Sequence, residues 1–445
     1  MALLIKQQPL YNTLPIGQQI IFAVSDPTIV ATKYKVKFVA QVHITNGAIT
    51  LTNNNDLIGT FKTTPNNAGV GIFDFRPVIE TFVKPDHEPQ TTIVSNSDSE
   101  YKGTTAQSKM FPIHIVDKFA ISKNSIKRFG INFFIEYSDS ATGAVIDFET
   151  LAPTPSESYK MFNGVVQYDD VLDVFQNDYG FNINKYYLDG SSRNLLTTAP
   201  TTQYARLEDY GTLSFLHIAS QQYYPLYGFN INYRDSAGGS LGGEVVQWNG
   251  GNGGATSLGP LSNTRLNYFG AFPANLKNWS ATFATAVTNG LSYYEITAIG
   301  SGVGEIWSKT YTINVLCPNL KGYEAIRLTW LNKWGTWDYY TFNMKSTKSV
   351  TTNRTSYTQL GGTWNEKTFK IAGYKGGKKN FRVNSTEKIK LNTDFVTEAD
   401  GVWFEQLVNS TEVYVLEGFQ TDPSFSSLNT YAQPTTITNS SYTRK

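Results

Sequence analysis

The sequence predicts an all-β protein made of tandem antiparallel β-sandwich-like domains, with one short helix in the C-terminal domain. Many short segments alternate apolar and polar side chains with a period of two, which is the spacing of β-strands. These segments recur at intervals of about 8–12 residues with turn-forming residues between them, as in sandwiches and barrels. Aromatic residues make up 14% of the 445 residues and charged residues only 16%, against roughly 25% charged in average proteins.

The strongest strand pattern is the aromatic segment 323–342, YEAIRLTWLNKWGTWDYYTF. Alternation runs on both sides of residues 332–336, and Gly335 supplies the positive φ that a tight hairpin turn requires. We therefore predict a β-hairpin. Its three tryptophans and three tyrosines are more than one strand pair can cover, so at least one face must pack on another sheet or subunit.

Four residues of this hairpin form a candidate site: Trp330, Trp334, Trp337 and Tyr339. In one interpretation they are packing residues of a β-sandwich core or a subunit interface. In the other they form an aromatic platform on which a ligand such as a sugar stacks. A sugar binder must keep at least two of the tryptophans exposed, whereas a structural subunit buries them.

The first predicted domain covers residues 1–155. Alternating or apolar runs place its strands at 18–30, 33–44, 49–54, 57–62, 69–77, 111–116 and 130–137, with a helical turn at 77–83. The long polar loop at 86–108 is predicted to be a flexible arm rather than a connection. Structureless loops of this length are uncommon inside compact domains.

The second predicted domain, a central β-sandwich, covers residues 156–318. Seven segments carry its strand pattern: MFNGVVQY, FNINKYYL, TLSFLHI, LYGFNINY, GEVVQW, SYYEITAI and WSKTYTINVL. The glycine-rich residues 250–259 are predicted to form a solvent-exposed loop. The only helix predicted in this domain lies at 169–177, because acidic residues at its start favour a helix N-terminus.

The third predicted domain covers residues 319–445 and opens with the aromatic hairpin. Its other strands are predicted at 367–374, 381–383 and 412–417, and a polar tail follows at 430–445. A basic tight turn between the first two of these strands contains Lys375, Lys378 and Lys379. We interpret this turn as a solvated hairpin tip, since charge runs of this kind usually face water.

The same domain contains the clearest helix signal of the chain. Thr397 is a capping residue, and Asp400 stands three positions later, close to a capping box. Trp403 and Leu407 then recur at helical spacing on an apolar face. We predict a short amphipathic helix at 398–409.

Composition excludes several classes of partner and chemistry. The net charge is +1, from 37 basic and 36 acidic residues, so no global field attracts nucleic acid or anionic lipid. Cys317 is the single cysteine, which rules out an intrachain disulfide and a cysteine cluster for zinc. The N-terminus lacks the apolar core of a signal peptide, and no run approaches 18 apolar residues. We expect a soluble product of cytoplasmic synthesis, without membrane insertion.

No catalytic, cofactor or metal site is predicted. The histidines are dispersed, and none has metal-ligand spacing: His43, His87, His114 and His217. No nucleophile elbow and no phosphate-binding loop is present. Glycoside hydrolysis needs two carboxylates in an aromatic cleft, and its candidates are Asp338, the pair Asp169 and Asp170, and Glu295. Each is better explained as a strand-edge or helix-start charge, so we expect no enzyme.

Several phrases of the sequence resemble virion proteins of tailed bacteriophages, especially marine and Bacteroidetes-infecting ones. They are RLTWLNKWGTWDYYTF behind Cys317, KIKLNTDFVTEADGVWFEQLVNSTEVYVL, and the N-terminal GIFDFRPVIETFV and FPIHIVDKF. The resemblance implies a non-enzymatic β-rich structural subunit of the tail, neck or baseplate, rather than of the capsid shell. Such proteins fold in the host cytoplasm and assemble in the virion as rings or fibres with other virion proteins.

Three functions follow, in order of preference. The first is a tail-associated assembly subunit that forms a symmetric homo-oligomer through aromatic sheet faces and extended loops. The second is a carbohydrate-binding or receptor-binding virion component that contacts a host-surface glycan. The third is a glycan-degrading enzyme, which should oppose two carboxylates across a cleft.

Overall fold

The computed structural model describes residues 3–45, 49–52, 54–88, 112–122, 124–165, 194–216, 226–247, 266–300, 304–316, 322–363, 366–417 and 431–438, with 172–173, 178–179, 186 and 188. It consists mostly of strands in several sheets, with a few short helices, so the predicted all-β class is confirmed. The chain divides into two compact units. The smaller comprises Asn319–Ile326 and Phe342–Val396, and the larger comprises the rest.

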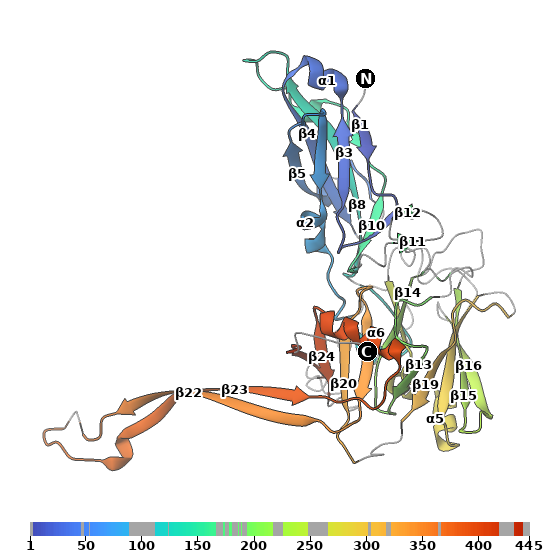
Figure 1. Cartoon of the computed structure of the whole chain (residues 1–445), viewed down its shortest axis with the longest axis vertical. Coiled ribbons are helices and arrows are strands. Elements are labelled where there is room, and N and C mark those ends of the chain that lie inside the picture. The colour runs from blue at the N-terminus through green and yellow to red at the C-terminus, as the bar shows by residue number, and fades with distance from the viewer. Residues whose placement is uncertain are drawn as a thin grey trace. The chain divides into compact units, whose positions relative to one another are not determined.

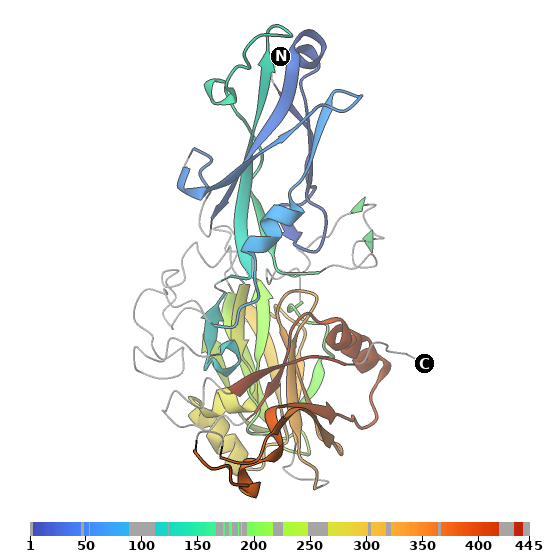
Figure 2. The same ribbon diagram turned by 90° about the vertical axis from the view of Figure 1, so that its left-hand side faces the viewer.

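Two sheets form a sandwich in the N-terminal part of the larger unit (Figure 1, Figure 2). The smaller sheet has the order β1–β3–β6: β1 (Leu4–Gln7), β3 (Ile21–Ser25) and β6 (Val70–Asp74). The larger has the order β2–β10–β8–β4–β5, with β9 beside β8: β2 (Thr13–Pro15), β4 (Tyr34–Thr45), β5 (Leu57–Thr63), β8 (Ile126–Ser138), β9 (Thr154–Pro155) and β10 (Tyr159–Phe162). Phe22 of β3 lies 5.6 Å from both Phe133 and Tyr159 between ring centroids, so the two inner faces share one core.

The strand predicted to reach Val30 ends earlier, because the side chain of Asp26 forms hydrogen bonds that start a helix. The carboxylate of Asp26 accepts hydrogen bonds from the backbone N–H groups of Thr28 (3.1 Å) and Ile29 (3.0 Å). Asp26 is therefore a helix N-cap, and α1 (Pro27–Thr32), which begins with proline, follows β3 directly. The strand prediction is wrong beyond Ser25.

Another predicted strand, at 111–116, is also wrong. Its described residues form the 3₁₀ turn Ile113–Ile115. The side-chain amide of Asn275 donates to the backbone carbonyls of His114 (3.0 Å) and Val116 (2.6 Å), so a side chain replaces a strand partner here.

Two further predictions near the N-terminus have different outcomes. Residues 49–52 contain no strand, although one was predicted at 49–54. The helical turn predicted at 77–83 is confirmed as α2 (Arg76–Ile79) followed by the 3₁₀ turn Glu80–Phe82.

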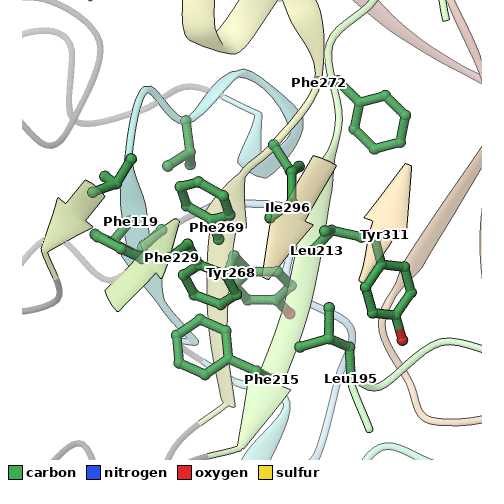
Figure 3. Packing of buried hydrophobic residues seen from close by; sticks show 14 of the residues in the cluster. Phe119, Leu195, Leu213, Phe215, Phe229, Tyr268, Phe269, Phe272, Ile296 and Tyr311 are labelled. Atoms are coloured by element: carbon green, nitrogen blue, oxygen red, sulfur yellow. The ribbon is translucent and has the colours of Figure 1, made fainter. Parts of the chain in front are cut away.

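A second sandwich occupies the centre of the chain. Its larger sheet has the order β13–β19–β18–β15–β16: β13 (Thr202–Ala205), β15 (Leu226–Arg234), β16 (Ser240–Gln247), β18 (Tyr293–Gly300) and β19 (Tyr311–Val315). Its smaller sheet has the order β14–β17–β7: β7 (Phe119–Ile121), β14 (Thr212–Leu216) and β17 (Leu266–Gly270). Phe229 from one sheet stacks on Phe269 from the other at 4.5 Å, in the core drawn in Figure 3.

Two helices of this part were not predicted, α4 (Pro273–Lys277) and α5 (Ala281–Thr288). The hydroxyl of Ser280 accepts a hydrogen bond from the backbone N–H of Phe283 at 2.8 Å, which caps α5. The helix predicted at 169–177 is wrong where it is described, because β11 (Leu172–Asp173) pairs with β12 (Asp178–Tyr179).

A four-stranded sheet with the order β21–β20–β24–β25 forms the C-terminal part of the fold: β20 (Ile326–Leu331), β21 (Trp337–Phe342), β24 (Val413–Leu416) and β25 (Ala432–Thr435). The aromatic hairpin is thus confirmed, as is the closing strand. The predicted helix is confirmed as α6 (Glu398–Asn409), with Thr397 and Asp400 in a reciprocal capping box. β25 lies inside the segment predicted to be a polar tail.

The sheets differ from the predicted domain boundaries at 155 and 318. β10 lies beyond 155, yet it pairs with β8 and, in parallel, with β2. β7 lies before 155, yet it pairs with β17. Trp337 and Leu416, both beyond 318, belong to the same core as the central sandwich. Alternation along one strand does not encode which distant strand will pair with it.

Among its described residues, the smaller unit contains one antiparallel strand pair, β22 (Thr347–Gln359) with β23 (Gly377–Lys390), drawn as a long ribbon in Figure 1. We call residues 347–390 the exposed hairpin, because every residue of β22 is exposed and β23 is nearly so. The strand predicted at 381–383 lies inside β23. No strand forms among the described residues of 367–374, where Gly373–Lys375 is a 3₁₀ turn instead.

Several predicted features fall on residues outside the described ranges. They are most of the polar loop 86–108, the glycine-rich loop 250–259, most of the segment 169–177, Cys317, His217 and the last residues of the tail.

Candidate functional site

The turn of the aromatic hairpin is built by one asparagine and one glycine. Oδ1 of Asn332 accepts hydrogen bonds from the backbone N–H of Trp334 (2.9 Å) and of Thr336 (3.2 Å). Gly335 has a φ of +72°. A Cβ added to it would lie 1.5 Å from the backbone oxygen of Asn163, so both conformation and space require glycine here.

All four residues of the candidate platform are buried. Trp330 packs on Trp403 of α6, with ring centroids 4.9 Å apart. Nε1 of Trp337 donates to the backbone oxygen of Asp86 at 2.8 Å. Trp334 packs on Tyr186 at 4.0 Å.

The fourth residue, Tyr339, has a hydroxyl that lies 3.0 Å from the Thr212 hydroxyl and 2.9 Å from Nδ1 of His114. The four rings are therefore packing residues in this structure, and they offer no exposed platform.

Both faces of the aromatic hairpin are covered, which explains its unusual ring content. Trp334, Trp337 and Tyr339 join the core of the central sandwich. On the other side, Tyr340 packs on Phe404 of α6 at 4.7 Å, in the same way as Trp330 packs on Trp403. A strand pair buried on two faces needs large apolar side chains at consecutive positions. The sequence indicated at least one covered face, and the structure has two.

Asp338, one of the candidate carboxylates for glycoside hydrolysis, is buried between the aromatic hairpin and α6. It accepts hydrogen bonds from Thr197 Oγ1 (2.7 Å), Asn332 Nδ2 (3.0 Å) and Trp403 Nε1 (2.8 Å). Burial raises its pKa to about 6, although the three hydrogen bonds favour the ionised form. Its donors come from three separate segments, so Asp338 joins parts of the fold.

The other glycosidase candidates do not form a pair with it in the described contacts. Glu295 forms an ion pair with Arg234 at 3.3 Å across β18 and β15. Asp169 and Asp170 lie outside the described residues.

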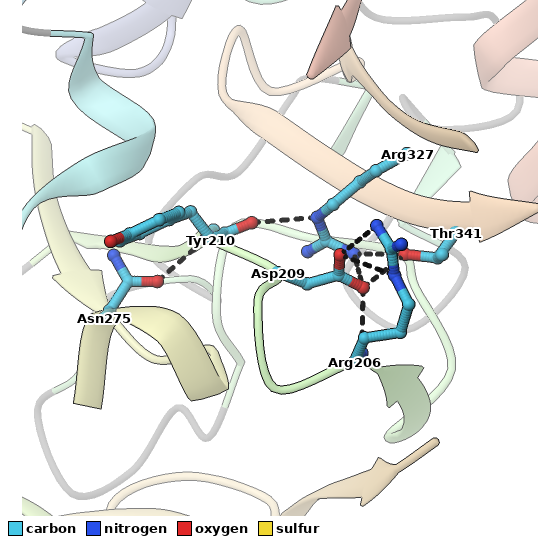
Figure 4. Close-up of polar contacts among 7 residues, drawn as sticks. Arg206, Asp209, Tyr210, Asn275, Arg327 and Thr341 are labelled. Carbon is cyan, nitrogen blue, oxygen red and sulfur yellow. Dashed lines mark hydrogen bonds and ion pairs between the residues drawn. The ribbon is translucent and has the colours of Figure 1, made fainter. Parts of the chain in front are cut away.

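A buried ion pair fastens β20 to the loop that precedes β14 (Figure 4). The Asp209 carboxylate lies 3.5 Å from Arg327 Nη1 and accepts hydrogen bonds from Thr341 Oγ1 (2.7 Å) and Arg206 Nη2 (2.8 Å). Nε of Arg327 donates to the backbone oxygen of Tyr210 at 2.9 Å. Burial opposes ionisation of Asp209, but the charges of Arg327 and Arg206 outweigh it and lower its pKa.

Two of the described histidines, His87 and His114, pack against Trp337, and the third, His43, lies in β4. His114 is buried, and burial lowers its pKa to about 3, so its imidazole is neutral at physiological pH. Nε2 of His87 lies 3.2 Å from the carboxylate of Glu412, and His43 is buried in β4. Among the described residues, no group of three or more His, Cys, Asp or Glu side chains is placed to hold a metal ion.

The exposed hairpin is a surface that sequence reasoning missed. Eight of the 23 exposed large hydrophobic residues in the described part of the chain lie in it: Val350, Tyr357, Leu360, Phe369, Ile371, Tyr374, Phe381 and Val383. Ile371 is 85% exposed, Tyr374 82% and Phe381 77%. Monomeric proteins rarely present so many large apolar side chains together, and such a surface marks an interaction site. The signal in the sequence is a pair of strand patterns with too few apolar residues to be buried on either face.

The basic residues predicted to form a tight turn are spread along this hairpin. Lys375 ends the 3₁₀ turn, while Lys378 and Lys379 lie inside β23. Nζ of Lys379 donates to Gln359 Oε1 of the opposite strand at 2.6 Å. Lys375 therefore stands in a turn, whereas Lys378 and Lys379 are strand residues.

No helix in the described residues has the length and apolar character needed to cross a membrane. No protein-family model matches the sequence, and no curated protein matches it. The choice among the three candidate functions therefore depends on the contacts described above.

Proposed function

We propose that this protein is a structural subunit of a tailed-bacteriophage virion, located in the tail, neck or baseplate. It forms a homo-oligomer, and that oligomer binds other virion proteins. The observation that carries the proposal is the exposed hairpin. Two strands with both faces in water are marginally stable on their own, and they need a third strand or a packed face. A subunit gains that face when it assembles.

The larger unit supports the same proposal, because its buried ionisable side chains form contacts that stabilise the fold. Asp338, Asp209 and His114 are buried, and each contacts other buried groups of the fold. A unit of packed sheets, joined in one chain to an exposed apolar hairpin, suits a subunit that holds its neighbours. The proposal includes no catalytic residue, cofactor, metal or nucleic acid.

The virion assignment is supported by the phrases that resemble phage structural proteins. RLTWLNKWGTWDYYTF forms β20 and β21, and the second long phrase runs from the end of β23 through α6 to β24. Within the larger unit, β21 and α6 meet at Asp338 and Trp403, so the first phrase packs against part of the second. The alternative, a receptor-binding component that stacks a host-surface glycan on Trp330, Trp334, Trp337 and Tyr339, is disfavoured because these side chains are buried.

The oligomeric state tests the assembly part of the proposal. Light scattering after size-exclusion chromatography of the full chain should give a mass that is a multiple of 49.6 kDa, and electron microscopy should show closed rings or fibres. A monomer that persists at micromolar concentration counts against self-assembly. For the virion part, labelled antibodies against the chain should decorate one structure of purified phage particles, and decoration of the capsid shell alone would contradict it.

A further inference from the structure

The charge of the chain is divided between the exposed hairpin and everything else. The hairpin contains ten of the 37 basic residues and two of the 36 acidic residues, which is a net charge of +8. The remainder of the chain therefore carries −7. The near-zero total conceals two parts of opposite sign, and parts of opposite sign attract between copies of one chain.

The positive charge and the apolar surface coincide in the outer half of the hairpin. We call residues 357–383 the hairpin tip. The tip holds six basic residues and one acidic residue. Seven of its large apolar residues are exposed: Tyr357, Leu360, Phe369, Ile371, Tyr374, Phe381 and Val383. Nucleic acid would account for the charge, but its phosphate contacts would leave the exposed aliphatic side chains of Leu360, Ile371 and Val383 uncovered.

Hydrogen bonds hold the tip in one shape. The backbone N–H of Thr363 donates to the backbone oxygen of Lys370 at 3.1 Å, and the N–H of Lys370 donates to Thr363 Oγ1 at 3.0 Å. The N–H of Lys375 donates to the backbone oxygen of Ala372 at 2.9 Å. A preorganised surface loses less conformational entropy on binding than a flexible one.

A matching acidic surface lies on α6, which has three acidic residues and no basic residue, a net charge of −3. Glu398, Val402 and Glu405 stand at helical spacing on one side of α6, and Val402 is 43% exposed. This side of α6 therefore presents an apolar residue between two acidic ones. Such a surface is complementary to a tip that is basic and apolar.

We propose that the hairpin tip of one copy docks on the acidic side of α6 in a second copy. This inference rests on the proposed self-assembly and names its contact. A second copy is the occupant because every copy carries both the basic apolar tip and the acidic helix, so their opposite charges can pair between copies.

A charge-swap cycle tests the contact. Lys370 and Lys378 are exposed in the tip, and K370E/K378E should weaken self-association about 10- to 100-fold, measured by sedimentation velocity across protein concentrations. E398K/E405K should weaken it similarly. The chain with all four substitutions should recover association, because the charges again have opposite signs. Association of the original chain should also weaken as salt rises.

A matched control separates tip docking from a general effect of net charge. K388E/K390E makes the same charge change in the hairpin, at the end far from the tip, and should leave association within about twofold. Circular dichroism and thermal unfolding of every variant should show an intact fold. Equal weakening by the control, or no recovery in the four-substitution chain, would overturn the docking.

Other results identify other occupants of the tip. If the original chain is monomeric throughout, the proposed self-assembly fails and the docking fails with it. If the chain assembles and K370E/K378E assembles equally well, only the docking fails. If the original chain stays monomeric but binds random-sequence DNA, and K370E/K378E loses that binding, the tip is a nucleic-acid surface instead.

Discussion

The indole Nε1 of Trp403 donates a hydrogen bond to Oδ2 of the buried Asp338 at 2.8 Å. Trp403 belongs to α6 and Asp338 to β21, so this contact joins the helix to the aromatic hairpin. The neighbouring Trp330 packs on the same indole ring. Its own Nε1 has no hydrogen-bond partner in the described part of the chain. Two tryptophans in contact thus differ in what their N–H groups do.

Replacing each of these tryptophans by phenylalanine should therefore have unequal effects. W403F keeps most of the ring but leaves Oδ2 of Asp338 without its donor, which should lower the free energy of unfolding by about 1–3 kcal/mol beyond the loss of ring area. W330F removes an N–H that has no hydrogen-bond partner among the described residues. It should therefore lower the free energy of unfolding only by the loss of buried ring area. Urea unfolding of both variants gives the comparison, and equal losses would contradict the role of the hydrogen bond.

Asp338 should also make stability depend on pH. Its folded pKa of about 6 is above that of an exposed aspartate, so the folded state binds the proton more tightly than the unfolded state. The stabilising contribution of the protonated form is present below about pH 4 and is lost as pH rises through about 6. Relative to D338N, the wild-type free energy of unfolding should fall by roughly 2 to 3 kcal/mol between pH 4 and pH 7. A constant difference between the two proteins would refute this.

Removal of Arg327 should be far more costly than removal of an exposed arginine. R327M leaves the buried Asp209 without one of its two cationic partners, and breaking such a pair costs about 3–5 kcal/mol. R234M breaks the ion pair with Glu295, in which both side chains are about 30% exposed, and should cost at most about 1 kcal/mol. Thermal and urea unfolding measure both. Because the pKa of Asp209 is lowered, the difference between wild type and R327M should shrink as pH falls below about 4.

Two glycines with similar backbone conformation provide a test of close packing. Gly335 (φ +72°) faces the backbone of Asn163, whereas a Cβ on Gly290 (φ +88°) would meet nothing within 4 Å. G290A should cost about 1 kcal/mol from conformation alone. G335A adds an overlap with backbone atoms and should cost about 3 kcal/mol or more. Similar losses for the two variants would mean that the turn moves freely away from Asn163.

Several elements could be predicted because their causes are local. The aromatic hairpin depends on alternation and on a glycine four residues into its turn region, and α6 depends on Thr397 and Asp400, three positions apart. The two missed N-caps, Asp26 and Ser280, are equally local, and their sequence signals are an aspartate before proline and a serine before an alanine-rich run. The sequence does not decide whether Trp330 and Trp337 are buried, because alternation indicates which side chains share a face but not what covers that face.

The sequence by itself determined the strand class, the aromatic turn and the C-terminal helix, since each rests on interactions between residues a few positions apart. Tertiary structure alone decided that β7 pairs with β17, that both faces of the aromatic hairpin are covered, and that none of the described sheets covers 347–390. Those outcomes depend on contacts between residues far apart in the chain. The excess of basic residues at 347–390 can be counted in the sequence. Only the structure shows that these residues form an exposed hairpin.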